Sequence, residues 1–142
     1  MTPKLCWRLA SGLTMFFALA HTAGMLSPAD RGPEEAAVLA HMRGYHFQIM
    51  GATRTYWDFF FGFGMLVTAA LVVMSLLSWR VAAVSDKDGD LARQLGWPLL
   101  TGQMAFAALS WKYFFLAPAL VSSAATVCSL VGLVKQKDVG GR

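Results

Sequence analysis

Four long stretches without a formally charged residue occupy most of this 142-residue chain. A helix needs about 20 mostly apolar residues to cross roughly 30 Å of hydrocarbon. Charged residues make up only 14% of the chain, whereas soluble domains carry about 25%, so lipid is expected around much of the surface. The stretches cover residues 9–29, 59–79, 94–111 and 113–134, with lengths of 21, 21, 18 and 22 residues.

These stretches predict four transmembrane helices within one membrane domain that covers residues 1–142. Every connection is short enough to join antiparallel neighbours, so we expect an all-α integral membrane four-helix bundle. Small and weakly polar residues recur at helical spacing in each span, which allows close helix packing in lipid. The predicted spans lie near residues 6–27, 57–79, 95–114 and 117–135.

Two prolines bear on where the last two spans begin. Trp97-Pro98 opens the third helix, or that helix starts near Leu91 and kinks at Pro98. Pro118 suits the first turn of the fourth helix, where a missing N–H leaves no hydrogen bond unmade.

The first stretch has an alternative interpretation as a cleaved signal peptide. Lys4 and Arg8 form a positive segment ahead of the apolar run, and Ala18-Leu19-Ala20 resembles a cleavage site. The apolar run continues past that point to Leu26, which favours a membrane span.

Basic residues in the short loops predict the orientation. With the N-terminus inside the cell, eight Lys and Arg lie inside and four lie outside, so N-in and C-in is favoured. The basic residues form no stripe of the kind that binds nucleic acid. We therefore expect an integral membrane protein with both termini in the cytoplasm. The inside set is Lys4, Arg8, Arg80, Lys87, Arg93, Lys135, Lys137 and Arg142, and the outside set is Arg31, Arg43, Arg54 and Lys112.

The first outer loop predicts a short amphipathic helix over about residues 34–50. Gly32-Pro33-Glu34-Glu35 is typical of a helix start, with proline early and carboxylates at the positive end of the helix dipole. After it, Val38, Met42, Tyr45 and Ile49 recur at helical spacing. This helix would lie on the outer membrane surface or cap the bundle.

Ionisable residues near the outer ends of the first two spans form a candidate ligand site. His21 approaches a helix C-terminus and Asp58 opens the next helix, so the dipoles stabilise a cation and an anion respectively. Arg54 precedes Asp58 by one turn. An ionisable residue within a span is a functional-site candidate, although these three could equally pin the helices together. The predicted ligand-binding set is His21, Arg54, Asp58, Trp57 and His46; no metal site, cofactor or catalytic residue is predicted.

A short motif around the second span carries a resemblance to a known family. Phe47-x3-Gly51-x2-Arg54-x3-Asp58-Phe59-x2-Gly62-Phe63-Gly64, with His21 and Gly24 ending the first span, resembles small four-span bacterial membrane proteins of the DoxX-like group. That resemblance implies a place in the bacterial cytoplasmic (inner) membrane, and a link to quinone-dependent sulfur oxidation or to membrane redox complexes. The two cysteines, Cys6 and Cys128, form no CxxC pair, which argues against thiol redox chemistry here.

Three functions follow from these features. The first is a binding or accessory protein, with an outward pocket for a lipid, quinone or other apolar ligand, or with a membrane-protein partner or second copy. The second is an integral membrane enzyme that uses His21 as acid or base. The third is a small oligomeric transporter, although the spans lack a matching pair of Gly- or Pro-broken segments. The binding or accessory function is favoured, because an enzyme needs more convergent polar groups.

Overall fold

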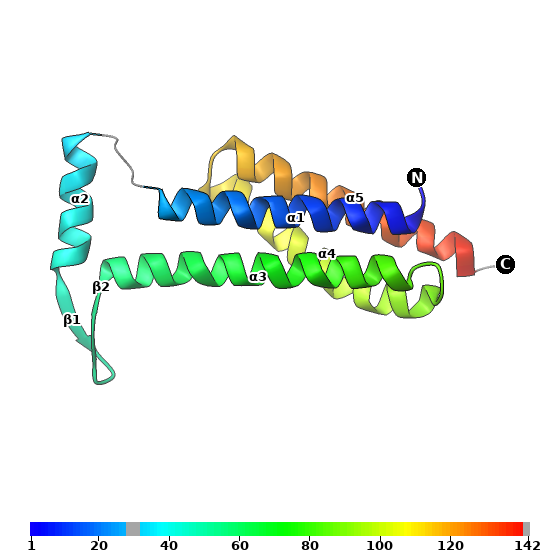
Figure 1. Ribbon diagram of the computed structural model, residues 1–142, viewed down its shortest axis with the longest axis horizontal. Coiled ribbons are helices and arrows are strands. Elements are labelled where there is room, and N and C mark those ends of the chain that lie inside the picture. The colour runs from blue at the N-terminus through cyan, green and yellow to red at the C-terminus, as the bar shows by residue number, and fades with distance from the viewer. Residues whose placement is uncertain (28–31, 141–142) are drawn as a thin grey trace. The chain divides into compact units, whose positions relative to one another are not determined.

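The computed structural model describes residues 1–27 and 32–140, with side chains described as far as Gln136. Over this range the chain is helical apart from two short strands (Figure 1), so the all-α prediction is confirmed. In chain order the elements are α1 (Pro3–Leu26), α2 (Pro33–Gly44), β1 (His46–Ile49), β2 (Ala52–Thr55), α3 (Tyr56–Val84), α4 (Gly89–Tyr113) and α5 (Leu116–Gly140).

Among the described helices, α1, α3 and the Leu116–Gln136 part of α5 are long and apolar enough to cross a membrane. The predicted third span corresponds to α4, which has 25 residues but is not among them. Gln94, Pro98 and Gln103 lower the hydropathy of α4. Whether α4 spans a membrane therefore depends on how far neighbouring helices bury its polar side chains.

The helices follow the predicted spans but run further at several ends. Helix α3 continues to Val84, five residues past the predicted end. Helix α4 begins at Gly89 rather than near residue 95, because the Asp88 side chain accepts a 2.9 Å hydrogen bond from the Leu91 amide and caps it. Pro98 lies inside α4, as in the second of the two alternatives. Pro118 is the third residue of α5, as predicted.

The chain forms two compact units, and helices α1 and α3 each contribute to both. Unit 1 comprises Met1–Ala18 and Ala70–Arg142, and unit 2 comprises Leu19–Ala69.

A fully buried tryptophan, Trp7, organises the core of unit 1. Its indole lies against Gly96 of α4 and Gly132 of α5, where even a methyl group would approach the ring to 2.8 and 2.9 Å. The missing side chains let α4 and α5 close around the ring. The core residues come from α1, α3, α4 and α5; they are Trp7, Val81, Ala82, Ala92, Leu99, Leu100 and Leu133.

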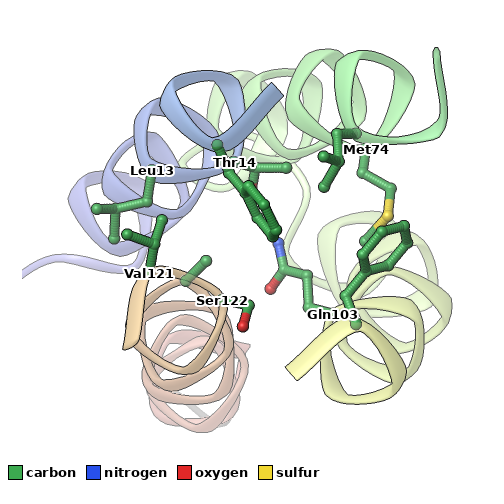
Figure 2. Close-up of a pocket in the computed structure, with 10 residues that line it drawn as sticks. Leu13, Thr14, Met74, Gln103, Val121 and Ser122 are labelled. Carbon is green, nitrogen blue, oxygen red and sulfur yellow. The ribbon is translucent and has the colours of Figure 1, made fainter. Parts of the chain in front are cut away.

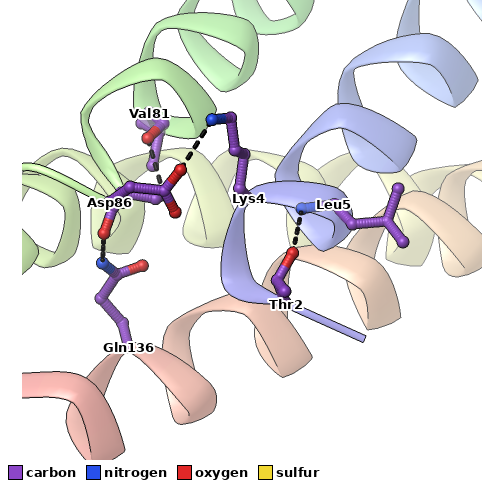
Figure 3. A network of polar contacts seen from close by, with 7 residues as sticks. Thr2, Lys4, Leu5, Val81, Asp86 and Gln136 are labelled. Carbon is purple, nitrogen blue, oxygen red and sulfur yellow. Dashed lines mark hydrogen bonds and ion pairs between the residues drawn. The ribbon is translucent and has the colours of Figure 1, made fainter.

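Polar contacts tie the helices of unit 1 together at two levels. Inside the unit, the Ser11 and Ser75 hydroxyls lie 3.1 Å apart, and each also lies 2.9 Å from the other residue's carbonyl oxygen. At the turn between α3 and α4, Lys4 forms a 2.6 Å ion pair with Asp86 (Figure 3). Gln136 donates a 2.8 Å hydrogen bond to the carbonyl of Ser85 in the same turn.

In unit 2, the outer helix is shorter than predicted. Helix α2 begins at Pro33 with Glu34 and Glu35 in its first turn, as predicted, but it ends at Gly44 rather than near residue 50. Residues 46–55 form an antiparallel hairpin instead.

The hairpin closes through the two residues Met50 and Gly51. Both have positive φ, 48° and 83°, which is the geometry that matches the twist of paired strands. Tyr45 and Ile49 therefore leave the predicted apolar stripe. The spacing was misleading because cross-strand pairing, which links residues that are not neighbours along a helix, decides the structure here.

Candidate functional site

The five predicted ligand-binding residues all lie in unit 2. His21 is on α1, His46 on β1 and Arg54 on β2, while Trp57 and Asp58 are in the first turn of α3. Each of the five makes a local contact, and the partners of these contacts differ from one residue to the next.

Asp58 is engaged with the residue that precedes α3. The Thr55 amide donates a 2.8 Å hydrogen bond to the Asp58 carboxylate, and the Asp58 amide donates a 3.1 Å bond to the Thr55 hydroxyl. This reciprocal arrangement is a capping box, which satisfies two backbone donors at the helix start. The Thr-x-x-Asp spacing in the sequence was the signal for it. The carboxylate therefore has a structural role at the positive end of α3.

Arg54 makes its own contact with the hairpin backbone. Its guanidinium donates a 2.8 Å hydrogen bond to the carbonyl of Thr53, and the side chain is exposed. Arg54 and Asp58, both within the described residues, form no ion pair. Arg54 is thus available to a ligand, and the alternative in which it pairs with Asp58 to pin the loop is not what the structure shows.

His21 of α1 makes a contact with the backbone of α3 in unit 2. Its Nε2 lies 3.1 Å from the carbonyl oxygen of Gly64. The flexible end of the Met25 side chain also lies close to Gly64. Gly64 follows Asp58 by six residues, about 9 Å along a helix. The structure therefore joins His21 to the third turn of α3 rather than to its capped start.

His46 is exposed, and its Nδ1 lies 2.9 Å from the carbonyl oxygen of Gly44. Among residues 1–27 and 32–136, no group of three or more His, Cys, Asp and Glu side chains is placed to hold a metal ion.

Aromatic side chains cluster around the hairpin and the start of α3. The Tyr45 and Tyr56 rings stack with centroids 5.8 Å apart, and Phe47 contacts both. The Arg43 guanidinium lies 4.2 Å from the centre of the Trp57 ring, a cation–π contact. Sequence reasoning included Trp57 but missed Arg43, because only the hairpin brings the end of α2 back to α3.

An open hollow of about 610 Å³ lies beside this aromatic cluster. Small-molecule sites are typically hollows of about 300–1,000 Å³ with apolar walls and a few polar groups. The residues that line it include the apolar Val38 and Met42, and three residues that carry polar groups, His41, Tyr45 and Tyr56. Both tyrosines are more than half exposed. None of these residues was in the predicted set, since α2 and the hairpin had to be placed first.

Compared with protein families, with curated proteins and with solved structures, the chain matches none of them.

Proposed function

We propose that the chain is an integral protein of the bacterial cytoplasmic membrane, with four spans and both termini in the cytoplasm. Three apolar helices of membrane length support this, as does the eight-to-four bias of basic residues. Helix α4 would be the fourth span, with the polar side chain of Gln103 buried within unit 1 (Figure 2).

Within that membrane, the protein acts as a binding or accessory protein for an amphiphile. The hollow beside Tyr45 and Tyr56 is the observation that carries this proposal. It lies at the start of a membrane-length helix, and tyrosine and tryptophan favour the level of the lipid headgroups. The ligand would be a lipid or a quinone, with its polar head among the tyrosine hydroxyls, His41 and Arg43.

The predicted site residues take different parts in this proposal. Trp57, Arg54 and His46 border the aromatic cluster and would contribute to head-group binding. Asp58 would act indirectly, by fixing the start of α3. His21, which contacts the Gly64 carbonyl, would hold α1 against α3. A DoxX-like relationship would favour a quinone as the ligand and a membrane redox complex as the partner.

Native mass spectrometry of the gently extracted protein tests the proposal. We expect a retained lipid or quinone in the unaltered protein, and its loss in Tyr45→Ala and Tyr56→Ala. Tyr113→Ala is the matched control, because Tyr113 is equally exposed but lies in unit 1. Equal retention by all three variants would show that the hollow is not the site.

A further inference from the structure

The hairpin of unit 2 has one polar face and one apolar face. Side chains alternate between the two faces along a strand, and the pairing of Gln48 with Thr53 places both of these residues on one face. On that face the Gln48 amide donates a 2.8 Å hydrogen bond to the Thr53 hydroxyl. Phe47 and Ile49, which flank Gln48 in the strand, therefore lie on the opposite face. The hairpin is thus amphipathic.

The apolar face of the hairpin is turned toward the body of α3. The centre of the Phe47 ring lies 5.2 Å from that of Tyr56 and 5.8 Å from that of Phe59, one turn into the helix. The Phe59 ring is in turn 6.0 Å from the ring of Phe63, which is exposed. Helix α3 is long and apolar enough to cross a membrane. The row of rings therefore joins the apolar face of the hairpin to a helix surface suited to lipid.

The tip of the hairpin continues this apolar face. Ile49 is exposed, and Met50, the first residue of the turn, is fully exposed. Figure 1 shows the tip lying clear of α2 and of the start of α3 within unit 2. Met50 also has a positive φ of 48°, a conformation for which asparagine or glycine is the usual residue in such turns. The geometry of the turn therefore does not account for a methionine, and strain of this kind is found where a side chain has a function.

We propose that the tip of the hairpin inserts into the lipid interface at the start of α3, with Ile49 and Met50 among the upper acyl chains. The proposal rests on the membrane location proposed above. In this arrangement Gln48 and Thr53, on the polar face, meet water. Arg54 lies on the apolar face, and its long side chain keeps the charge at the level of the lipid headgroups. The inserted tip holds the start of α3, and with it the neighbouring hollow, at the level of the lipid interface.

Methionine-methyl NMR of the protein in phospholipid nanodiscs tests the insertion. Two relaxation agents are compared, a phospholipid with a nitroxide near the headgroup end of its acyl chain and a water-soluble gadolinium chelate. Met50→Leu assigns the Met50 signal, and Thr53→Met places a reference methyl on the polar face of the same hairpin. We expect the nitroxide lipid to broaden the Met50 methyl at least several-fold more than the reference methyl, and the chelate to do the reverse. Equal broadening of the two methyls by the chelate would overturn the proposal. Broadening of Met50 by neither agent would also overturn it, because a protein surface would then cover the tip.

The Met65 methyl, in the same spectra, separates a failure of this proposal from a failure of the proposed membrane location. Met65 lies nine residues after the start of α3, roughly 13 Å along the helix, and is partly exposed. If α3 crosses the membrane, the nitroxide lipid should broaden the Met65 methyl and the chelate should not. A protected Met65 beside a Met50 that is open to the chelate would refute the inserted hairpin alone. A Met65 that is open to the chelate would refute the membrane location, and the inserted hairpin with it.

Discussion

Replacing Gly132 with alanine should destabilise the protein, although glycine to alanine normally favours a helix. The added Cβ would lie 2.9 Å from Trp7 Nε1 and 3.1 Å from Trp7 Cδ1, whereas ordinary contacts are 3.4–4 Å. The indole is fully buried and meets Gly96 as well, so it has no space into which to move. Overpacking of this kind costs about 1–3 kcal/mol.

Gly12→Ala is the matched control for this prediction. Gly12 is exposed on α1, and a Cβ there would meet nothing within 4 Å. Both substitutions gain the same helix propensity, up to about 1 kcal/mol, so that gain cancels when the two are compared. We expect Gly132→Ala to be less stable than Gly12→Ala by about 1–3 kcal/mol.

The free energy of unfolding in mixed micelles, measured by denaturing-detergent titration, checks the difference. Trp7→Phe removes the indole atoms nearest to Gly132, so Gly132→Ala should cost less in that background. Such coupling identifies the contact itself as the cause. The argument from packing is wrong if Gly132→Ala and Gly12→Ala are equally stable. It is also wrong if Gly132→Ala costs as much in the Trp7→Phe background as in the unaltered protein.

Three further predictions concern topology, the hairpin and the start of α3. Cytoplasmic reporters fused at Asp88 and at the C-terminus should be active, and one fused at Gly32 should be inactive; activity at Gly32 would refute the N-in orientation. Met50→Asn should slow hydrogen exchange of the hairpin amides, because asparagine tolerates positive φ better than methionine. The expected slowing corresponds to an increase of about 1 kcal/mol in the free energy of opening the hairpin. Met50→Ala, which keeps the backbone strain, should not slow the exchange. Thr55→Val should lower the free energy of unfolding by about 1 kcal/mol, because the helix cap is lost. Thr53→Val, on the exposed surface of the hairpin, should change it little. Thermal unfolding measures both variants, and equal effects would argue against the cap.

Features that depend on neighbours along the chain were predictable. Helix α2 begins at Pro33 because proline and two carboxylates suit a helix start wherever it lies. The apolar stretches likewise gave the approximate positions of α1, α3 and α5, since length and hydropathy are properties of each segment. The Asp58 cap could also have been predicted, because Thr55 and Asp58 are three residues apart, as in a capping box.

Features that depend on distant residues were not predictable in the same way. The stripe from Val38 to Ile49 has helical spacing, yet Tyr45 and Ile49 lie beyond the end of α2, because the pairing of His46–Ile49 with Ala52–Thr55 outweighs local periodicity. The pairing also brings Arg43 to Trp57, which no spacing rule indicates.

By itself, the sequence determined that the chain is helical and that at least three segments have membrane length and apolar character. Only the tertiary structure decided which small residues matter. Gly96 and Gly132 are two glycines among 13 until Trp7 is packed between them. Gln103 is one polar residue on α4 until four helices close over it. Close packing and burial arise between segments, and so they appear only once the segments have been brought together.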